Sequence, residues 1–290
     1  MVGYTFTTMK KLLASSALLL AACSPAAPVV EDPSMHSEPS SASASAGVEG
    51  RLNDSPRHQE WVTVQNGERD IRVFVVYPET SAKVPAILVI HENKGLNDWA
   101  RGMADQLAEA GYIAVAPDLL SEFDATHADT ASFPSDDERT KALMTLDPAQ
   151  VTADLEAVGA WAKALPASNG KLASAGFCWG GSQSFNLAAK SDDLDMALVF
   201  YGTGPTSEAS YADVSAPIYG FYAGNDERVN ATIPMSTTEM AEAGKTYDIE
   251  TYDGAGHAFM RSGEDPSGDP ANVAARNAAW ERMKRVLETL

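Results

Sequence analysis

One short segment, Gly176-Phe177-Cys178-Trp179-Gly180-Gly181, limits the folds open to this chain more than any other. It follows the strand-like run Lys171–Gly176 and precedes a helical stretch over residues 182–190. In such a turn the flanking glycines relieve crowding around a strained central residue, and the turn presents that residue's side chain above a sheet. The backbone N–H of Trp179 then faces a bound carbonyl, and the helix N-terminus favours a thiolate. A lone cysteine is more often a buried apolar residue, but this setting predicts a nucleophile.

Strands and helices alternate along the chain from Glu60 onward. Two alternating segments around Asn66-Gly67 predict an antiparallel hairpin. Further strands are expected at residues 85–90, 112–116, 171–176, 195–201, 216–222 and 247–252, and helices at 98–110, 148–165, 182–190, between the last two strands, and at 271–290. This order predicts one α/β domain over residues 57–290, with a mostly parallel central sheet and helices on both faces. The long polar segment 119–147 is expected to be a functional loop.

An acidic residue and a histidine follow the cysteine at later strand ends. Asp226 comes just after the strand expected at 216–222, and His257 lies in a glycine-rich loop after the strand at 247–252. Each also occurs in purely structural roles, the aspartate in turns or caps and the histidine in loops. The order Cys178, Asp226, His257 at successive strand ends is nevertheless that of the α/β-hydrolase fold. We therefore predict a Cys-His-Asp triad.

Several further motifs occur together and in a fixed order. They are His91-Glu92-Asn93-Lys94-Gly95-Leu96, Val115-Ala116-Pro117-Asp118-Leu119, Asn169-Gly170-Lys171 leading into the cysteine turn, Phe200-Tyr201-Gly202, and Gly254-Ala255-Gly256-His257-Ala258-Phe259. From about Glu60 to Leu290, the chain resembles the dienelactone hydrolase family, also called carboxymethylenebutenolidases. The resemblance implies an α/β-hydrolase fold and an enzyme that cleaves an ester or lactone through a thioester on cysteine.

The resemblance also implies roles for two residues that follow the strand at 85–90. In the family, the carboxylate at the position of Glu92 contacts the resting thiol and takes part in generating the thiolate when substrate displaces it. The N–H of Asn93 would be the second oxyanion donor, beside that of Trp179. A loop glutamate is often simply solvated, but Glu92 is expected next to the cysteine turn. His91 is given no chemical role.

Basic side chains hold a substrate carboxylate in this family. Arg261, four residues after His257, matches one such position. The other falls at Lys141, where the family has Arg, so a bidentate guanidinium is replaced by a point charge. Arg139 lies nearby and is a possible substitute, and Tyr201 is a further candidate for substrate binding. This departure leaves open whether a dienelactone is the substrate.

The N-terminus has the pattern of an export signal. Residues 1–22 contain no acidic residue, and two lysines precede an apolar run that is too short to span a bilayer. The run ends in Leu20-Ala21-Ala22-Cys23, which resembles the bacterial lipobox, in which the cysteine is lipidated. An ordinary secreted protein cleaved near Ala22 is the alternative. Residues 23–56, rich in Ser, Ala and Pro, are predicted to be a disordered tether. We therefore expect an exported lipoprotein of the bacterial cell envelope, held to a membrane by its lipid anchor.

Composition and the absence of motifs exclude several classes of function. The net charge of -19 argues against nucleic acid as a partner, and two cysteines exclude a disulfide scaffold or a thiolate zinc site. No metal or organic cofactor is expected, because H-E-x-x-H, P-loop and G-x-G-x-x-G patterns do not occur. A monomer is expected, with a small ester or lactone as substrate. The alternatives left open are a broad-specificity carboxylesterase, an acyltransferase of the same fold, and a non-catalytic envelope binding lipoprotein.

Overall fold

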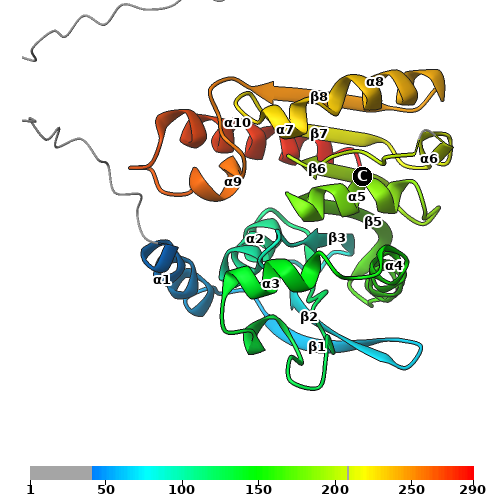
Figure 1. The fold of residues 1–290 in the computed structure, drawn as a ribbon. Helices are drawn as coiled ribbons and strands as arrows, with labels where there is room; N and C mark the ends of the chain where they lie inside the picture. Colours follow the sequence, from blue (N-terminus) through cyan, green and yellow to red (C-terminus); the bar gives the residue numbers. More distant parts are fainter. Residues whose placement is uncertain (1–40, 208) are drawn as a thin grey trace, which may run out of the picture. The chain divides into compact units, whose positions relative to one another are not determined.

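A mostly parallel eight-stranded sheet forms the centre of the protein (Figure 1). The computed structural model describes residues 41–207 and 209–290, so the predicted signal peptide and Cys23 lie outside the described residues. The strands are β1 (Gln59–Asn66), β2 (Arg69–Val76), β3 (Val84–Ile90), β4 (Ile113–Pro117), β5 (Ser168–Phe177), β6 (Met196–Phe200), β7 (Ile218–Ala223) and β8 (Tyr247–Tyr252). Their order is β1-β2-β4-β3-β5-β6-β7-β8.

The sheet changes from antiparallel to parallel pairing at β4. The predicted hairpin of β1 and β2 is present, with Gln59 opposite Val76, and β2 also pairs antiparallel with β4. All pairings from β4 to β8 are parallel, as the alternation of strands and helices predicts. The carboxyl ends of the parallel strands therefore meet at one edge of the sheet, where α/β proteins place their ligand sites.

Helices cover both faces of the sheet, so the predicted fold class is confirmed. The helices are α1 (Ser41–Asn53), α2 (Asp98–Glu109), η1 (Thr130–Ser132), α3 (Asp136–Leu143), α4 (Pro148–Lys163), α5 (Trp179–Ala188), α6 (Ala209–Ala212), α7 (Glu227–Asn230), α8 (Ile233–Glu242), α9 (Phe259–Ser262) and α10 (Pro270–Leu287). One core cluster joins α2 and α10 to the sheet through residues such as Met103 and Met283, and the other joins α4 and α5 through Leu155 and Phe185. Strand β3 serves both clusters, because its alternate side chains point to opposite faces.

Polar caps fix where the main helices begin. The Asn97 side chain accepts a hydrogen bond from the backbone of α2, and Asp147 and Asp269 do the same for α4 and α10. In α4 and α10 a proline follows the cap at the first helical position, where its missing N–H costs nothing. These caps explain why the starts of the three helices are close to their predicted positions.

The folded unit begins earlier than predicted. Residues 41–53 of the expected disordered tether form helix α1, which packs on α2. Val48 and Leu52 are only 3% and 6% exposed, and both belong to the core cluster on the α2 face. Gly102 of α2 permits this packing, because a Cβ there would lie 2.6 Å from a methyl carbon of Val48. The tether prediction is therefore wrong for this segment.

The segment 119–147 contains structure of its own rather than a simple loop. It includes η1 and α3, and it has a small apolar cluster made of Leu120, Phe133, Ala142 and Leu143. Asp118 binds it to the sheet by accepting hydrogen bonds from the backbone N–H and the hydroxyl of Thr130. The same hydroxyl oxygen accepts from the N–H of Leu96, so the segment also supports the chain that follows β3.

Among the described residues, no helix has the length and apolar character needed to cross a membrane.

Candidate active site

The strained turn predicted at the cysteine is present between β5 and α5. Cys178 has φ 55° and ψ -115°, a conformation that an L residue rarely adopts. Helix α5 begins at Trp179, three residues earlier than predicted. Only glycine fits at position 180, because a Cβ there would lie 2.3 Å from the backbone oxygen of Ile90 at the end of β3. The sequence therefore packs the turn directly against the segment that carries His91, Glu92 and Asn93.

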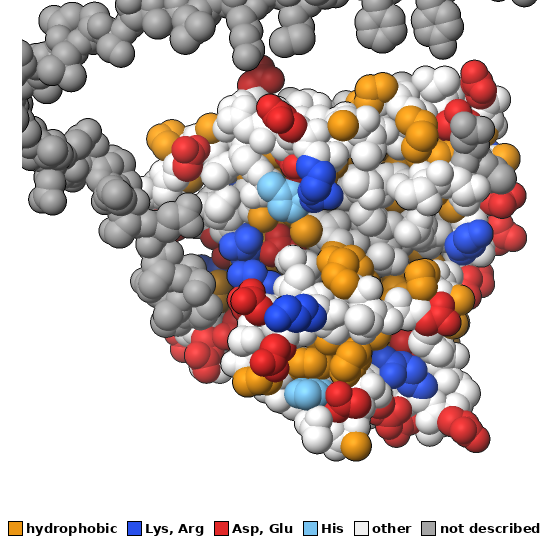
Figure 2. Space-filling view, in the orientation of Figure 1, with side chains coloured by type: hydrophobic (Ala, Val, Ile, Leu, Met, Phe, Trp, Pro, Cys, Tyr) orange, Lys and Arg blue, Asp and Glu red, His pale blue; other side chains and the backbone are white. Residues whose placement is uncertain are grey.

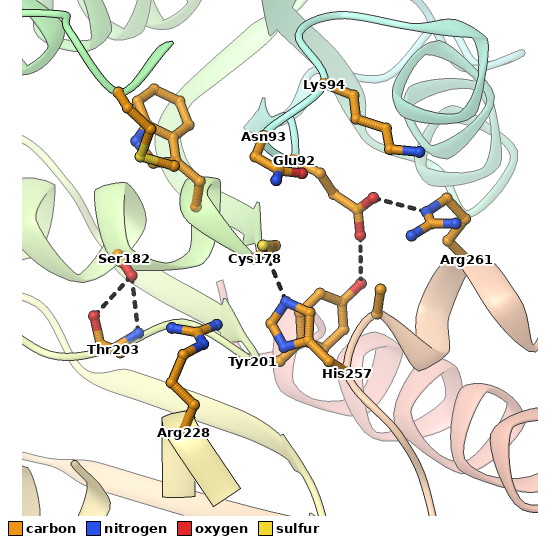
Figure 3. Close-up of a pocket in the computed structure, with 13 residues that line it drawn as sticks. Glu92, Asn93, Lys94, Cys178, Ser182, Tyr201, Thr203, Arg228, His257 and Arg261 are labelled. Carbon is orange, nitrogen blue, oxygen red and sulfur yellow. Dashed lines mark hydrogen bonds and ion pairs between the residues drawn. The ribbon is translucent and has the colours of Figure 1, made fainter. Parts of the chain in front are cut away.

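Three predicted residues from different strand ends form a hydrogen-bonded row. The Sγ of Cys178 lies 3.0 Å from Nε2 of His257 (Figure 3), and Nδ1 of His257 lies 2.5 Å from Oδ2 of Asp226. Asp226 is 6% exposed, and its other oxygen accepts from the N–H of Val229 at the start of α7. The carboxylate thus holds Nδ1–H, which leaves Nε2 free to accept the thiol proton.

Burial keeps the cysteine in its thiol form. Loss of solvent and the negative charge of Glu92 raise the pKa of Cys178 to about 11, while the backbone N–H groups of Trp179 and Asn93 act in the opposite direction. The expectation that the helix N-terminus favours a thiolate is therefore outweighed in the resting protein. Both N–H groups nevertheless lie close enough to the sulfur to lower its pKa, so an oxyanion formed on a carbonyl that the sulfur attacks would lie within their reach.

Glu92 lies beside the cysteine but is held by other partners. Its Oε2 accepts a hydrogen bond of 2.8 Å from Nε of Arg261, and its Oε1 accepts one of 3.4 Å from the hydroxyl of Tyr201. The carboxylate is 3% exposed, and Tyr201 is 1% exposed. Within the described residues the thiol is hydrogen-bonded to His257, so the contact between Glu92 and the thiol that the resemblance implies is not the one found.

A pocket of about 560 Å³ opens at the carboxyl ends of β3, β5, β6 and β8. Seven predicted site residues line it: Glu92, Asn93, Cys178, Trp179, Tyr201, His257 and Arg261. Two predicted substrate-binding residues do not. Lys141 is exposed on α3, and Arg139 is bound to Asp136 and to backbone carbonyls of the segment 119–147. Met144 just after α3 lines the pocket instead.

Two other cations, which the sequence analysis did not single out, line the pocket. Lys94 forms an ion pair of 3.0 Å with Asp136. Arg228, on α7, is exposed, and in the described part of the chain its guanidinium has no ion-pair partner. Its position two residues after Asp226 was the available signal, because the residues that follow a strand end surround the same pocket.

Around this pocket the charge differs from that of the whole chain. The protein has a net charge of -19, yet Figure 2 shows Lys and Arg side chains near the middle of one face and most Asp and Glu side chains toward its edge. No cluster of three or more His, Cys, Asp or Glu side chains suited to a metal ion occurs among the described residues.

The fold, together with a pocket at the carboxyl ends of its parallel strands, is that of an α/β-hydrolase. The family model of the Dienelactone hydrolase family matches residues 71–290. The carboxymethylenebutenolidases of Pseudomonas putida and Pseudomonas knackmussii are each 31% identical over 222 residues, which cover 74% of this chain and 91% of theirs. The chain therefore belongs to the dienelactone hydrolase family, and it is a hydrolase that acts on ester or lactone bonds.

Solved structures agree on the fold. A dienelactone hydrolase-like promiscuous phosphotriesterase from metagenomic libraries matches with a TM-score of 0.68 and 23% identity, over 81% of this chain and 98% of its own. At that identity the likeness extends to the fold alone.

Proposed function

We propose that this hydrolase cleaves an ester or lactone through a thioester on Cys178, and that its substrate carries a carboxylate. The observation that carries the proposal is the row from Cys178 Sγ through His257 to Asp226, with the N–H groups of Asn93 and Trp179 near the sulfur. A thiol next to an imidazole that is oriented by a carboxylate is the arrangement that nucleophilic catalysis requires.

The reaction then has two halves. Sγ attacks the substrate carbonyl while Nε2 of His257 takes the thiol proton, and the oxyanion forms against the two N–H groups. The protonated His257 gives this proton to the leaving oxygen as the carbon–oxygen bond breaks, which leaves a thioester. His257 next removes a proton from water, which attacks the thioester, releases the acid and restores the thiol. In a lactone the leaving oxygen stays on the acyl chain, so the product is a single ring-opened acid.

The raised pKa of the Cys178 thiol makes the proton transfer to His257 part of this reaction. Because burial and the charge of Glu92 keep the sulfur protonated, little thiolate exists at neutral pH before substrate binds. We propose that Glu92 orients Arg261 in the pocket and keeps the thiol unreactive, while His257 accepts its proton.

Arg228 is the cation best placed to bind a substrate carboxylate. The guanidinium of Arg261 already bonds Glu92, and Lys94 is paired with Asp136, whereas Arg228 lines the pocket without an ion-pair partner in the described residues. In Figure 3 Arg228 and Arg261 lie on opposite sides of His257. A substrate whose carboxylate is bound by Arg228 would thus extend over the thiol of Cys178.

The test of the mechanism is turnover of a butenolide lactone and of a small activated ester by wild type and by Cys178→Ala. We expect turnover by wild type and loss of at least a thousandfold in the variant. A covalent acyl adduct on Cys178 should be visible by mass spectrometry after a rapid acid quench. Equal rates in the two proteins would refute the mechanism, and products formed with added alcohols or amines in preference to water would identify an acyltransferase.

The test of the carboxylate site compares two esters that differ only in a carboxylate and its methyl ester. Loss of a charge-assisted hydrogen bond of about 1.5–3 kcal/mol predicts that Arg228→Ala lowers kcat/KM for the acid by roughly 10- to 150-fold. The neutral ester should change by less than about threefold. Lys141→Ala is the matched control, since it removes a positive charge outside the pocket. An equal effect of Arg228→Ala on both esters would exclude the site.

A further inference from the structure

His91 is a buried histidine that the proposed reaction does not use. It directly follows β3, it is fully buried, and its ring stacks on that of Trp179 with centroids 5.7 Å apart and planes 15° from parallel. Its Nδ1 lies 2.8 Å from the carbonyl oxygen of Glu92, and its Nε2 lies 3.4 Å from the N–H of Leu119. A buried polar ring with partners on both nitrogens is fixed in one orientation.

The two partners also determine where the ring carries its proton. The carbonyl of Glu92 can only accept, so Nδ1 of His91 must be the donor. The N–H of Leu119 can only donate, so Nε2 must be the acceptor. The ring is therefore neutral, with its proton on Nδ1. Burial agrees with this, since it lowers the pKa of His91.

The carbonyl that His91 binds belongs to the peptide that carries an oxyanion donor. The carbonyl of Glu92 and the N–H of Asn93 are parts of one planar peptide unit, so the direction of one fixes the direction of the other. A hydrogen bond to the carbonyl also polarises the peptide and strengthens its N–H as a donor. On its other side, Asn93 is held through its own carbonyl, which accepts a hydrogen bond of 2.8 Å from the hydroxyl of Thr140.

We infer that His91 is a positioning residue for both oxyanion donors. Through Nδ1–H it sets the direction of the Asn93 N–H, and through its stacked ring it supports Trp179, whose backbone N–H is the second donor. The inference rests on the proposed function for its catalytic consequence. The geometric part, the direction of two N–H groups at Cys178, does not depend on which substrate is cleaved.

Two substitutions separate the bonds that His91 makes. The side-chain amide of His91→Asn can still donate to the Glu92 carbonyl, as Nδ1 does. The longer side chain of His91→Gln can still accept from Leu119 but does not reach the carbonyl. Both lack the stacked ring, so the difference between them reports the bond at Nδ1. In His91→Phe the ring remains and both hydrogen bonds are lost.

The catalytic readout is kcat and KM for a small activated ester. Removing an oxyanion donor outright lowers kcat by about 10²- to 10³-fold, so a misdirected donor should cost roughly 10- to 100-fold. We expect this loss of kcat in His91→Gln and His91→Phe, with KM within about twofold of wild type. His91→Asn keeps the bond at Nδ1 but loses the stacked ring, so its kcat should fall by less than that of His91→Gln. Thermal melting identifies any variant whose loss comes from unfolding.

A second readout needs no turnover. Since both N–H groups favour the thiolate of Cys178, their misdirection should raise its pKa further. A tenfold loss of thiolate at pH 8, partly offset by the higher nucleophilicity of a more basic sulfur, predicts alkylation by iodoacetamide about threefold slower. The rate is followed on the peptide that contains Cys178. We expect slower alkylation in His91→Gln and His91→Phe, and a smaller decrease in His91→Asn, which keeps the bond at Nδ1 but not the stacked ring.

The outcomes separate the inference from the proposed function. Wild-type alkylation and kcat in folded His91→Gln and His91→Phe would overturn the inference, and so would an equal loss in His91→Asn and His91→Gln. If wild type cleaves no ester while the alkylation rates still differ as expected, the positioning role stands and the proposed function fails. If His91→Phe does not fold, the comparison of His91→Asn with His91→Gln decides the matter alone.

Discussion

Arg261 and Glu92 form an ion pair of 2.8 Å between α9 and the end of β3, although 169 residues separate them in the sequence. The carboxylate is 3% exposed and the guanidinium 37%, so the pair lies at the inner wall of the pocket. Desolvation lowers the pKa of Arg261, but the charge of Glu92 and the hydrogen bond between the two side chains act in the opposite direction, and with the other nearby groups they raise the pKa above its ordinary value. The pair therefore keeps a negative charge beside Cys178 while occupying one nitrogen of the arginine.

Removal of that negative charge should make the thiol more reactive toward alkylation. Because Glu92 helps raise the pKa of Cys178 to about 11, Glu92→Gln lowers this pKa and increases the thiolate fraction at pH 8. We expect alkylation by iodoacetamide to become several-fold faster. The rate should still rise with pH, but the inflection of its pH–rate profile should lie at a lower pH than in wild type. The measurement is a pH–rate profile between pH 7 and 10.

Glu92→Asp is the control for this experiment, since it keeps the charge and should stay near wild type. Slower alkylation in Glu92→Gln would contradict the electrostatic role. It would instead favour the role that the family resemblance implies, in which the carboxylate takes part in forming the thiolate.

Asp226→Asn should abolish most of the activity without loosening the fold. The amide can still accept from the N–H of Val229, so the start of α7 keeps its cap. It no longer stabilises a protonated His257 and does not enforce the proton on Nδ1. We expect kcat to fall by about 10³- to 10⁴-fold in an ester hydrolysis assay.

The melting temperature of Asp226→Asn should stay within about 2 °C of wild type, a stability change well under 1 kcal/mol. A variant that keeps a tenth or more of the wild-type kcat would show that Asp226 is not the partner on which His257 depends.

Gly180→Ala should destabilise the turn at the cysteine. The new Cβ would lie 2.3 Å from the backbone oxygen of Ile90 and 2.4 Å from that of His91, and neither oxygen can move without displacing the end of β3. Overpacking of this kind costs about 1–3 kcal/mol, which urea unfolding can measure. Gly50→Ala is the matched control, since open space surrounds that position on α1. Equal stability of the two variants would contradict the close approach of α5 and β3.

Much of the site could be predicted because its signals are local. Cys178 directly follows β5, and Asp226 and His257 lie in the loops that follow β7 and β8, so the order of three strand ends along the chain is enough to predict that they meet. The strained backbone at Cys178 also has a local cause, since glycines on both sides accept the contacts that the turn imposes.

The partners of the charged residues could not be predicted in the same way. Arg261 was expected to face a substrate, and Lys141 to join it, but pairing depends on packing between distant segments. Arg261 forms an ion pair with Glu92, whereas Lys141 is exposed on α3. Arg228 had no motif to mark it.

The buried positions on the last helix were predicted only in part. Spacing of large apolar residues favoured Val273, Trp280, Met283 and Val286 as buried residues of α10, and of these Met283 is fully buried whereas the other three are only partly buried. The fully buried positions include Ala275 and Ala279, because small side chains let the helix approach the sheet closely. Periodicity of large residues alone does not identify such a face.

Leu52→Ala should test whether α1 is part of the folded domain. The sequence places only two large apolar residues, four apart, on the side of this segment that meets α2, too few for composition to reveal a docked helix. Removing a buried leucine near the edge of the core should lower the free energy of unfolding by about 2–3 kcal/mol, as measured by urea denaturation of the full chain. Glu49→Ala, at an exposed position of the same helix, should change it by less than about 0.5 kcal/mol. Equal stability of the two variants would mean that residues 41–53 do act as a tether, because a detached helix contributes no core contact that Leu52→Ala can remove.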